Sequence, residues 1–324
     1  MDAITVSPGA RITPRSRTRW RAIIKGALTY VPGANWVLPK PSAGNRPPAS
    51  YFYGVWMKHL AYLSAGGFPI PQTVAELGPG DTLGLGICAL LSGARRYYGL
   101  DIVPHTNRAQ NLPVLDELAD MFARRVPRPV RGWPDFGEYL DAREFLPRLT
   151  ESARALDPER LRRLRQALLE GASEDLAVMY RVPWSSDDVV EESSVDLVIS
   201  QAVLEHVRDI RETYASLHRW LKPGAIMSHQ IDFRSHDLAD EWDGHRGISE
   251  GLWSVMLGRR PYLINREPWS AHASAITDAG FKIIRVMLLK RTDGIARASL
   301  APRWRSLSNE DFTCAEAFVQ AQKI

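Results

Sequence analysis

A glycine-rich turn, and a carboxylate about 20 residues after it, are the first features of this chain that could do chemistry. The turn at 76–80 reads ELGPG and follows a short apolar run, while Asp101 ends a second such run. Glycines at the end of a strand let backbone N–H groups approach a ligand, and the helix that follows presents its positive end there. A carboxylate at the end of the next strand can accept from ribose hydroxyls. Together they predict a nucleotide site.

The residues around the turn distinguish two classes of nucleotide ligand. A dinucleotide site needs a third glycine three residues after Gly80, and Leu83 stands at that position. The carboxylates Glu76 and Asp81 would repel a pyrophosphate and attract a cationic ligand. S-adenosylmethionine carries an amino group, a sulfonium and no phosphate. We therefore favour S-adenosylmethionine over a nicotinamide dinucleotide as the cofactor.

Motifs in chain order resemble those of the class I S-adenosylmethionine-dependent methyltransferases. They are VAELGPGD at 74–81, the acid Asp101, VDLVISQAVLEHV at 195–207, LKPGA at 221–225 and ITDAGF at 276–281. The stretch 51–84 is also similar to uncharacterised methyltransferases of bacterial polysaccharide gene clusters. The resemblance implies a Rossmann-like α/β fold, with a doubly wound, mostly parallel seven-stranded sheet.

The resemblance also implies which residues hold the cofactor. The glycines would line its methionine part, Glu76 would orient the turn and the amino acid end, and Asp101 would hold the ribose. Asp187 or Asp188 would accept from the adenine amino group, and Ser200 would border the methyl group. The predicted cofactor-binding set is Glu76, Gly78, Pro79, Gly80, Asp101, Ile102, Asp187, Ser200 and Gln201.

Methyl transfer from a sulfonium is an in-line displacement that needs alignment, and also a base when the acceptor is a hydroxyl. The predicted base is His206, because an imidazole with a pKa of about 6.5 is partly neutral at physiological pH. Asp232, near the end of a strand, is the predicted acceptor contact, and Glu205 completes the catalytic set. Alternatively, Glu205 and His206 only cap or pack the next helix. The same acids and His206 could hold a metal, but no ligand spacing supports one, so none is predicted.

Alternating apolar runs and helical patterns predict a parallel sheet covered by helices. The expected strands are 73–77, 96–100, 177–182, 195–200, 225–233, 281–289 and 312–320, with helices at 82–92, 210–221 and 270–279. The expected domains are a basic extension at 1–49, a methyltransferase domain at 50–102 and 176–324, and an inserted helical lid at 103–175. A second segment over the site, 242–269, is rich in Trp and Arg.

Positive charge is concentrated in the first 50 residues, which hold eight Lys and Arg against one acid, whereas the remainder carries a net charge of −3. A broad nucleic-acid-binding face is therefore not expected. Residues 19–30 read as a basic amphipathic helix that either packs on the protein or lies weakly on an anionic membrane surface. With no membrane-spanning run and no secretion signal, we expect a cytoplasmic protein. Cys88 and Cys314 are expected to be buried, and a homo-oligomer is left open.

The expected activity is biosynthetic O-methylation of a small-molecule or glycoside acceptor. Aromatic side chains beside cations in the segment 242–269 suit a sugar ring or an anionic acceptor. Two other functions are left open. One is a nicotinamide-dependent oxidoreductase on a similar sheet, and the other is a non-catalytic, membrane-associated binding protein that has kept the fold.

Overall fold

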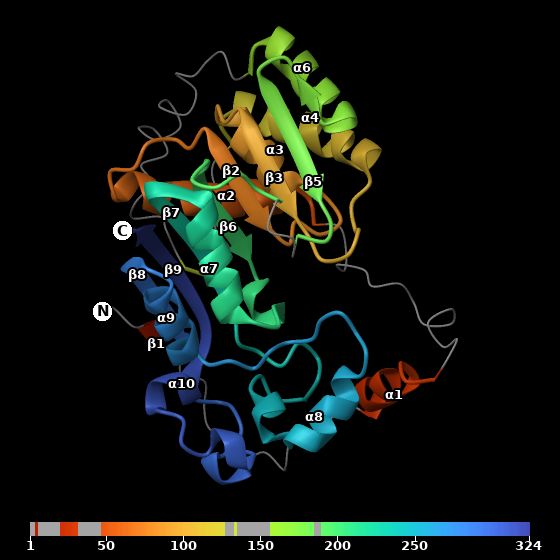
Figure 1. Cartoon of the computed structure of the whole chain (residues 1–324), viewed down its shortest axis with the longest axis vertical. Helices are drawn as coiled ribbons and strands as arrows, with labels where there is room; N and C mark the ends of the chain where they lie inside the picture. Colours follow the sequence, from red (N-terminus) through yellow and green to blue (C-terminus); the bar gives the residue numbers. More distant parts are fainter. Residues whose placement is uncertain (1–3, 6–19, 32–46, 127–132, 135–155, 185–188) are drawn as a thin grey trace. The chain divides into compact units, whose positions relative to one another are not determined.

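The computed structural model describes residues 4–5, 20–31, 47–126, 133–134, 156–184 and 189–324 (Figure 1). The chain divides into two compact units. The first unit is Pro41–Gln201, Ser216–Ser228 and Gln322–Ile324. The second unit is Met1–Lys40, Ala202–Ala215 and His229–Ala321. This division differs from the one expected from the sequence, which treated 50–102 and 176–324 as one domain.

The strands follow the hydrogen-bonded order β1-β8-β9-β7-β6-β2-β3-β5-β4. Their bounds are β1 Ile4–Thr5, β2 Thr73–Leu77, β3 Arg96–Leu100, β4 Ala172–Ser173, β5 Leu176–Arg181, β6 Val195–Gln201, β7 Leu221–Asp232, β8 Phe281–Lys290 and β9 Cys314–Lys323. Two of these, β1 and β4, have two residues each, which leaves the seven predicted strands. The pairs of β2 with β3, β2 with β6, and β3 with β5 are parallel. The predicted α/β fold with a mostly parallel sheet is confirmed.

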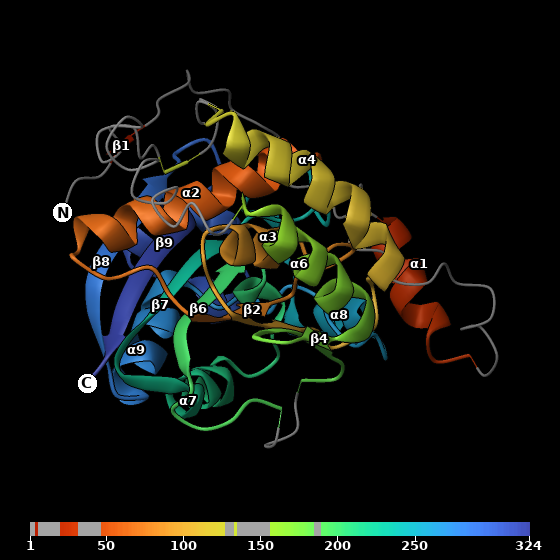
Figure 2. The same ribbon diagram turned by 90° about the horizontal axis from the view of Figure 1, so that it is seen from above.

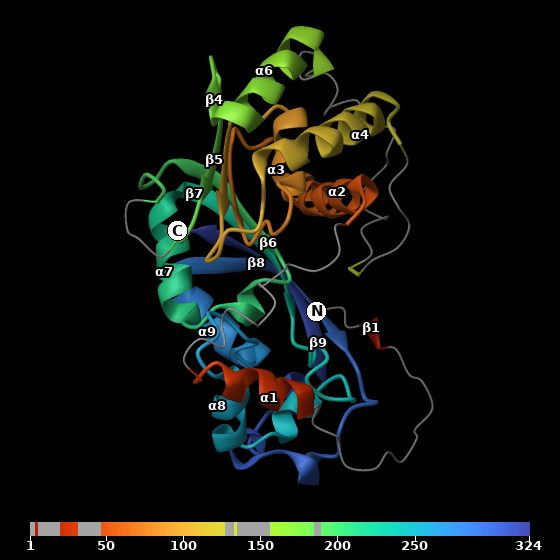
Figure 3. The same cartoon turned by 90° about the vertical axis from the view of Figure 1, so that its right-hand side faces the viewer.

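Strand β2 lies between β3 and β6 in the first unit, and all five of its residues are buried. Strands covered on both faces read as continuous apolar runs, which is why the sequence pattern located β2 and β3 correctly. The helices are α2 Ala49–Ala65, α3 Gly84–Leu91, α4 Asn111–Ala123 and α6 Pro158–Glu170. Helices α2, α3 and α4 lie together on one side of β2, β3 and β5 (Figure 3), and α4 runs alongside α2 (Figure 2).

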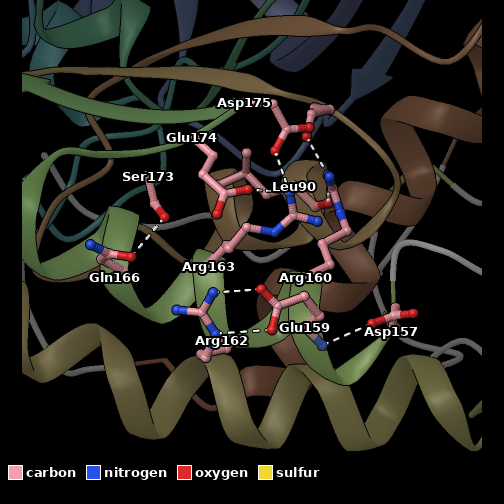
Figure 4. Close-up of polar contacts among 11 residues, drawn as sticks. Leu90, Asp157, Glu159, Arg160, Arg162, Arg163, Gln166, Ser173, Glu174 and Asp175 are labelled. Atoms are coloured by element: carbon pink, nitrogen blue, oxygen red, sulfur yellow. Dashed lines mark hydrogen bonds and ion pairs between the residues drawn. The ribbon is translucent and has the colours of Figure 1, made fainter.

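Helix α6 belongs to the insertion at 103–175. The Asp157 side chain accepts from the Glu159 N–H at its start, and Gly171, with φ 98°, ends it in the left-handed region. The buried guanidinium of Arg160 donates to the carbonyls of Leu90 (3.1 Å) and Ala94 (2.7 Å) at the end of α3 (Figure 4). The described helices of the insertion are therefore built into the first unit. A lid role for 103–175 stays a prediction, and 127–132 and 135–155 lie outside the described residues.

Helix α1, Trp20–Leu28, packs on α8, Glu250–Leu257, within the second unit. Gly26 permits the close approach, since a Cβ there would lie 2.1 Å from the Val255 carbonyl oxygen. Ala22 joins a buried cluster with Trp253 and Met256. The expected packing of this segment on the protein is thus confirmed for one side of the helix.

Several elements differ slightly from their expected bounds. Helix α7 spans Ile210–Trp220, and the LKPGA motif lies inside β7, which begins at Leu221 rather than at 225. Helix α9 spans Trp269–Asp278, followed by Gly280 with φ 91°. A short helix α10, Asn309–Thr313, delays the start of the last strand to Cys314. Across the described ranges, no helix is both long and apolar enough to span a membrane.

Candidate functional site

The glycine-rich turn joins the ends of β2 and β3 in the first unit. The Gly78 N–H donates to the Leu100 carbonyl over 2.8 Å. Gly78 and Gly80 have φ values of 63° and 72°, in the left-handed region where a side chain is disfavoured. The two glycines therefore give the turn a shape that brings backbone N–H groups to the carboxyl edge of the sheet, as the spacing predicted.

Asp101 lies directly against this turn. Its carboxylate accepts from the Ile102 N–H (2.9 Å) and the Gly80 N–H (3.3 Å), and 6% of the residue is exposed. Burial raises the pKa of Asp101, which the nearby His105 imidazole and these N–H groups oppose. Because a carboxylate offers about four lone pairs, the oxygens can still accept from ligand hydroxyls. The geometry suits the predicted ribose contact, which stays a prediction.

Glu76 is more deeply buried than its predicted role suggested, with 4% exposed. Its Oε2 accepts from the Tyr97 hydroxyl over 2.5 Å. Burial raises the pKa of Glu76 to about 8, and the Tyr97 hydrogen bond offsets only part of that rise. The sequence argument treated Glu76 as a fixed negative charge. In the structure it is mainly protonated near neutral pH until a positive group arrives.

Helix α3 begins at the turn and is held there by side chains that the sequence analysis missed. The Leu83 N–H donates to Asn111 Oδ1 over 2.7 Å, and Asn111 is fully buried. A Cβ on Gly84 or Gly86 would lie 2.3 Å from the ring of Phe52 or Tyr97 respectively. These two glycines, out of register for a dinucleotide, thus allow aromatic rings to pack on α3.

Ser200 and Gln201 end β6 in the same unit. Ser200 is fully buried, and Gln201 Oε1 accepts from Lys58 Nζ over 3.0 Å. Lys58 is 5% exposed, and its only signal in the sequence is a cation inside the apolar helix α2. Asp187 and Asp188, predicted to face adenine, lie outside the described residues. The nearby Trp184 N–H donates to the Asp101 carbonyl over 3.1 Å.

His206 and Glu205 occupy a single helical turn, Leu204–His206, in the second unit. The Asn265 side chain donates to the carbonyls of Leu204 (2.8 Å) and Val207 (3.0 Å), and the Asn265 N–H donates to the Glu205 carbonyl (2.6 Å). These bonds fix the turn without using either predicted catalytic side chain. Asn265 was missed because it comes about 60 residues later in the chain.

The His206 imidazole lies among other rings. Its centroid is 5.0 Å from that of His236 and 5.9 Å from that of Tyr262. Burial, together with His236, lowers the pKa of His206 to about 4. The imidazole is therefore neutral at physiological pH, the form that a general base requires. Its predicted catalytic role stays a prediction.

Asp232 lies in a cluster of charged side chains that the sequence analysis did not predict. Arg234 binds it with two nitrogens, Nε to Oδ1 at 2.8 Å and Nη2 to Oδ2 at 2.6 Å. Arg234 Nη2 also lies 3.1 Å from Glu316 Oε1. Although burial opposes it, the hydrogen bonds from His236 and Arg234 hold the pKa of Asp232 well below its usual range. Asp232 thus stays ionised and is poorly suited to accept a proton.

Glu205 and His236 complete this group. Glu205 is 3% exposed, and no side chain among the described residues donates to either carboxylate oxygen. His236 Nε2 lies 3.8 Å from Glu205 Oε1 and 3.5 Å from Asp232 Oδ2. Two further residues of the second unit, Asp243 and His245, make structural hydrogen bonds. Asp243 Oδ1 accepts from the Ile295 N–H (2.8 Å), and His245 pairs with the Ser235 hydroxyl (3.1 Å).

The Trp- and Arg-rich segment 242–269 is largely internal. Arg266 is 4% exposed and lies 4.2 Å over the buried Trp253 ring, while the buried Arg246 donates to the Asp311 carbonyl over 2.8 Å. These pairs stabilise the second unit, and the three Trp side chains of the segment, Trp242, Trp253 and Trp269, are buried. Of this segment, Tyr262 is the ring that reaches His206.

Comparison with known proteins gives one family match. Residues 152–228 match the methyltransferase domain family. The matched segment includes β5, β6 and α7 and ends within β7, and it leaves out the turn at 76–80. No curated protein sequence matches the chain.

Solved methyltransferase structures show weak likenesses. An S-adenosylmethionine-dependent methyltransferase from Mesorhizobium loti has 17% identity and a TM-score of 0.36, covering 84% of this chain and 100% of that one. Geranyl diphosphate C-methyltransferase from Streptomyces coelicolor has 12% identity and a TM-score of 0.39, covering 79% and 72%. Phosphoethanolamine N-methyltransferase 2 from Haemonchus contortus has 14% identity and a TM-score of 0.38, covering 85% and 56%. At these TM-scores the likenesses carry no weight for function.

The family match covers a part of the chain that the sequence motifs had already singled out. It includes VDLVISQAVLEHV, and it reaches the LKPGA motif within β7. The strand order around β2 is that of the predicted doubly wound sheet. Residues 152–228 are thus similar to the methyltransferase domain family, on strands in the order of a doubly wound α/β sheet.

Proposed function

We propose that this protein transfers the methyl group of S-adenosylmethionine to an oxygen of a small-molecule or glycoside acceptor. The observation that carries the cofactor assignment is the junction of Gly78, Gly80 and Asp101. There a left-handed turn is bonded to the end of β3 and a buried carboxylate faces the turn. A ribose and a methionine amino group fit these donors and acceptors without needing a phosphate-binding loop.

The cofactor assignment has a direct test in binding. S-adenosylhomocysteine should raise the melting temperature, and NAD or NADP should not, which separates a methyltransferase from an oxidoreductase. Asp101→Asn should weaken S-adenosylhomocysteine binding by about tenfold or more, because it loses charge-assisted hydrogen bonds worth roughly 1.5–3 kcal/mol. Asp120→Asn, at an exposed position on α4, is the matched control. Equal affinities of the two variants would reject the ribose role.

Oxygen methylation is supported by the neutral imidazole of His206. A hydroxyl nucleophile must lose its proton, and a neutral, positioned imidazole can receive it, although its lowered pKa makes it a weaker base. In the proposed reaction the acceptor oxygen forms a bond to the methyl carbon. The carbon–sulfur bond breaks with its electron pair returning to sulfur, and the hydroxyl proton passes to His206. Glu205 and Asp232 then act as neighbouring groups that set the charge around the acceptor.

The acceptor itself can be identified by labelling. Incubation with methyl-labelled S-adenosylmethionine and metabolite extracts, followed by identification of the labelled product, should give a methyl ether. Transfer only to nitrogen or carbon, or only to protein or nucleic acid, would contradict oxygen methylation of a small acceptor.

We also propose that helix α1 rests on anionic membrane surfaces. Ala22 and Gly26 face α8, which leaves an apolar stripe of Trp20, Ile24 and Leu28 exposed at 63%, 46% and 40%. Residues four apart share one helix face, and Arg21 and Lys25 are exposed beside the stripe. A basic helix with an exposed apolar face suits the headgroup region of a negatively charged bilayer. Such a surface would hold the enzyme near a lipid-linked acceptor.

A further inference from the structure

We propose that Glu205, His206 and His236 form a binding site for one divalent transition-metal ion. One ligand atom from each of these residues can be chosen so that all three lie within 4.8 Å of one another. Two imidazoles and one carboxylate, with further positions open, are a recurrent ligand set for Fe²⁺ and Zn²⁺. No local sequence pattern predicts this site, because His236 comes 30 residues after His206 in the chain.

The strongest sign of a missing ligand is Glu205 itself. The side chain is 3% exposed, no side chain in the described part of the chain donates to either oxygen, and the backbone N–H groups of Glu205 and Asp232 offset only part of the cost of its burial. The ring nitrogen Nδ1 of His206 is also buried without a partner there. Burying a carboxyl group without hydrogen bonds costs free energy, so native structures rarely leave one unsatisfied. A cation bound between Glu205 and the two imidazoles would satisfy it.

The carboxyl groups near the three-residue site also favour a bound cation. Glu205, Asp232 and Glu316 interact electrostatically. Arg234 lies within ion-pair distance of Asp232 and Glu316, so a cation bound at the three-residue site would face Glu205.

Backbone geometry supports a built site. His236 adopts φ 47° and Asp237 φ 63°, in the left-handed region that non-glycine residues enter at a cost of about 1–3 kcal/mol. This turn places His236 Nε2 within 3.8 Å of Glu205 and 3.5 Å of Asp232.

The role of the ion rests on the proposed function, whereas its binding does not. An ion held by these residues would take the acceptor hydroxyl at an open position and lower its pKa, so that the proton leaves to water. The oxygen then attacks the methyl carbon as the carbon–sulfur bond breaks toward sulfur. With the ion bound, His206 would activate the acceptor as a ligand of the ion, and the hydroxyl proton would pass to water instead of to His206.

The test uses Co²⁺ as the probe on chelator-treated full-length protein. Isothermal titration and visible absorption should show one Co²⁺ per chain, displaced by Zn²⁺. Glu205→Gln and His236→Asn should each weaken Co²⁺ binding by at least about a hundredfold. Asn is chosen at 236 because it tolerates a positive φ. The controls Glu212→Gln and His218→Asn change the same residue types on α7 and should bind as the wild type does.

The melting temperature, measured with and without Zn²⁺, is the second test of the metal site. Glu205→Gln should match or exceed the wild-type melting temperature without metal, since it removes a buried carboxyl that lacks side-chain partners, yet it should lose the rise that Zn²⁺ gives the wild type. Should Glu205→Gln fail to fold, the decision falls to His236→Asn, whose side chain is 27% exposed. Absence of stoichiometric Co²⁺ and Zn²⁺ binding to the wild type, or unchanged binding in the folded variants, would overturn the proposal. S-adenosylhomocysteine binding, measured alongside, reports separately on the proposed function.

Discussion

The Tyr97 hydroxyl donates a 2.5 Å hydrogen bond to Glu76 Oε2, and the Tyr97 ring occupies the space above Gly86. One aromatic side chain thereby connects strand β3, helix α3 and the carboxyl group at the glycine-rich turn. This packing requires a glycine at position 86, and the orientation of Glu76 depends on the hydrogen bond from Tyr97. Several testable properties of the cofactor site come from this connection.

Gly86→Ala should destabilise the protein by about 1–3 kcal/mol, because the new Cβ would lie 2.3 Å from the Tyr97 ring and force it to move. Chemical denaturation measures the free energy of unfolding. Gly251→Ala on α8 is the control, since nothing lies within 4 Å of its Cβ and alanine favours a helix. If both variants have the same stability, the close packing of Tyr97 on α3 is wrong.

Binding of S-adenosylhomocysteine should strengthen as pH rises from 6 to about 8. Burial raises the pKa of Glu76 to about 8, so at lower pH the carboxyl must release a proton before it can pair with the ligand's amino group. The limit is about tenfold in affinity for each pH unit. Titration calorimetry in buffers of different ionisation enthalpy would also detect the released proton.

Glu76→Gln should remove most of this pH dependence, whereas Glu117→Gln, exposed on α4, should keep it. A wild-type affinity that is constant between pH 6 and 8 would show that Glu76 does not change its protonation when the ligand binds.

His206→Gln should lower kcat by about 10²–10⁴, the usual contribution of a positioned base, and leave S-adenosylmethionine binding unchanged. In the wild type, burial lowers the pKa of His206 to about 4. The imidazole therefore stays neutral as pH falls from 7 to 5, and kcat/KM should not decline through His206 in that range. His218→Gln is the control. Loss of activity with an apparent pKa of about 6.5 that is absent from His206→Gln would contradict the lowered pKa of His206.

Removing the exposed apolar stripe of α1 should release the protein from anionic vesicles. Trp20→Ala combined with Ile24→Ser should reduce flotation with phosphatidylglycerol vesicles by about tenfold or more, because burying each side chain in the interface contributes roughly 1–3 kcal/mol. Leu169→Ser, at an apolar position of α6 that is 43% exposed, is the matched control. Equal flotation of both variants and the wild type would remove α1 as a membrane contact.

The sequence by itself determined the fold class, the glycine-rich turn and the place of Asp101 at the end of a strand. These features are local: an apolar run specifies a buried strand, and the glycines of 76–80 are adjacent in the chain. The motif segment at 195–207 likewise located Glu205 and His206. Local sequence patterns could not predict the domain division or the place of the inserted helices. Arg160 of helix α6 binds the carbonyl of Leu90 in α3, which lies about 70 residues earlier in the chain.

Only the tertiary structure decided the environments of these residues. Burial makes Glu76 a weak acid, the Arg234 guanidinium keeps Asp232 ionised, and His236 is brought beside Glu205. A pKa and a ligand set depend on dielectric and distance between groups far apart in the chain, and composition and spacing encode neither. The methyl donor could therefore be predicted from one turn, while the chemistry at the acceptor depends on how distant segments fold together.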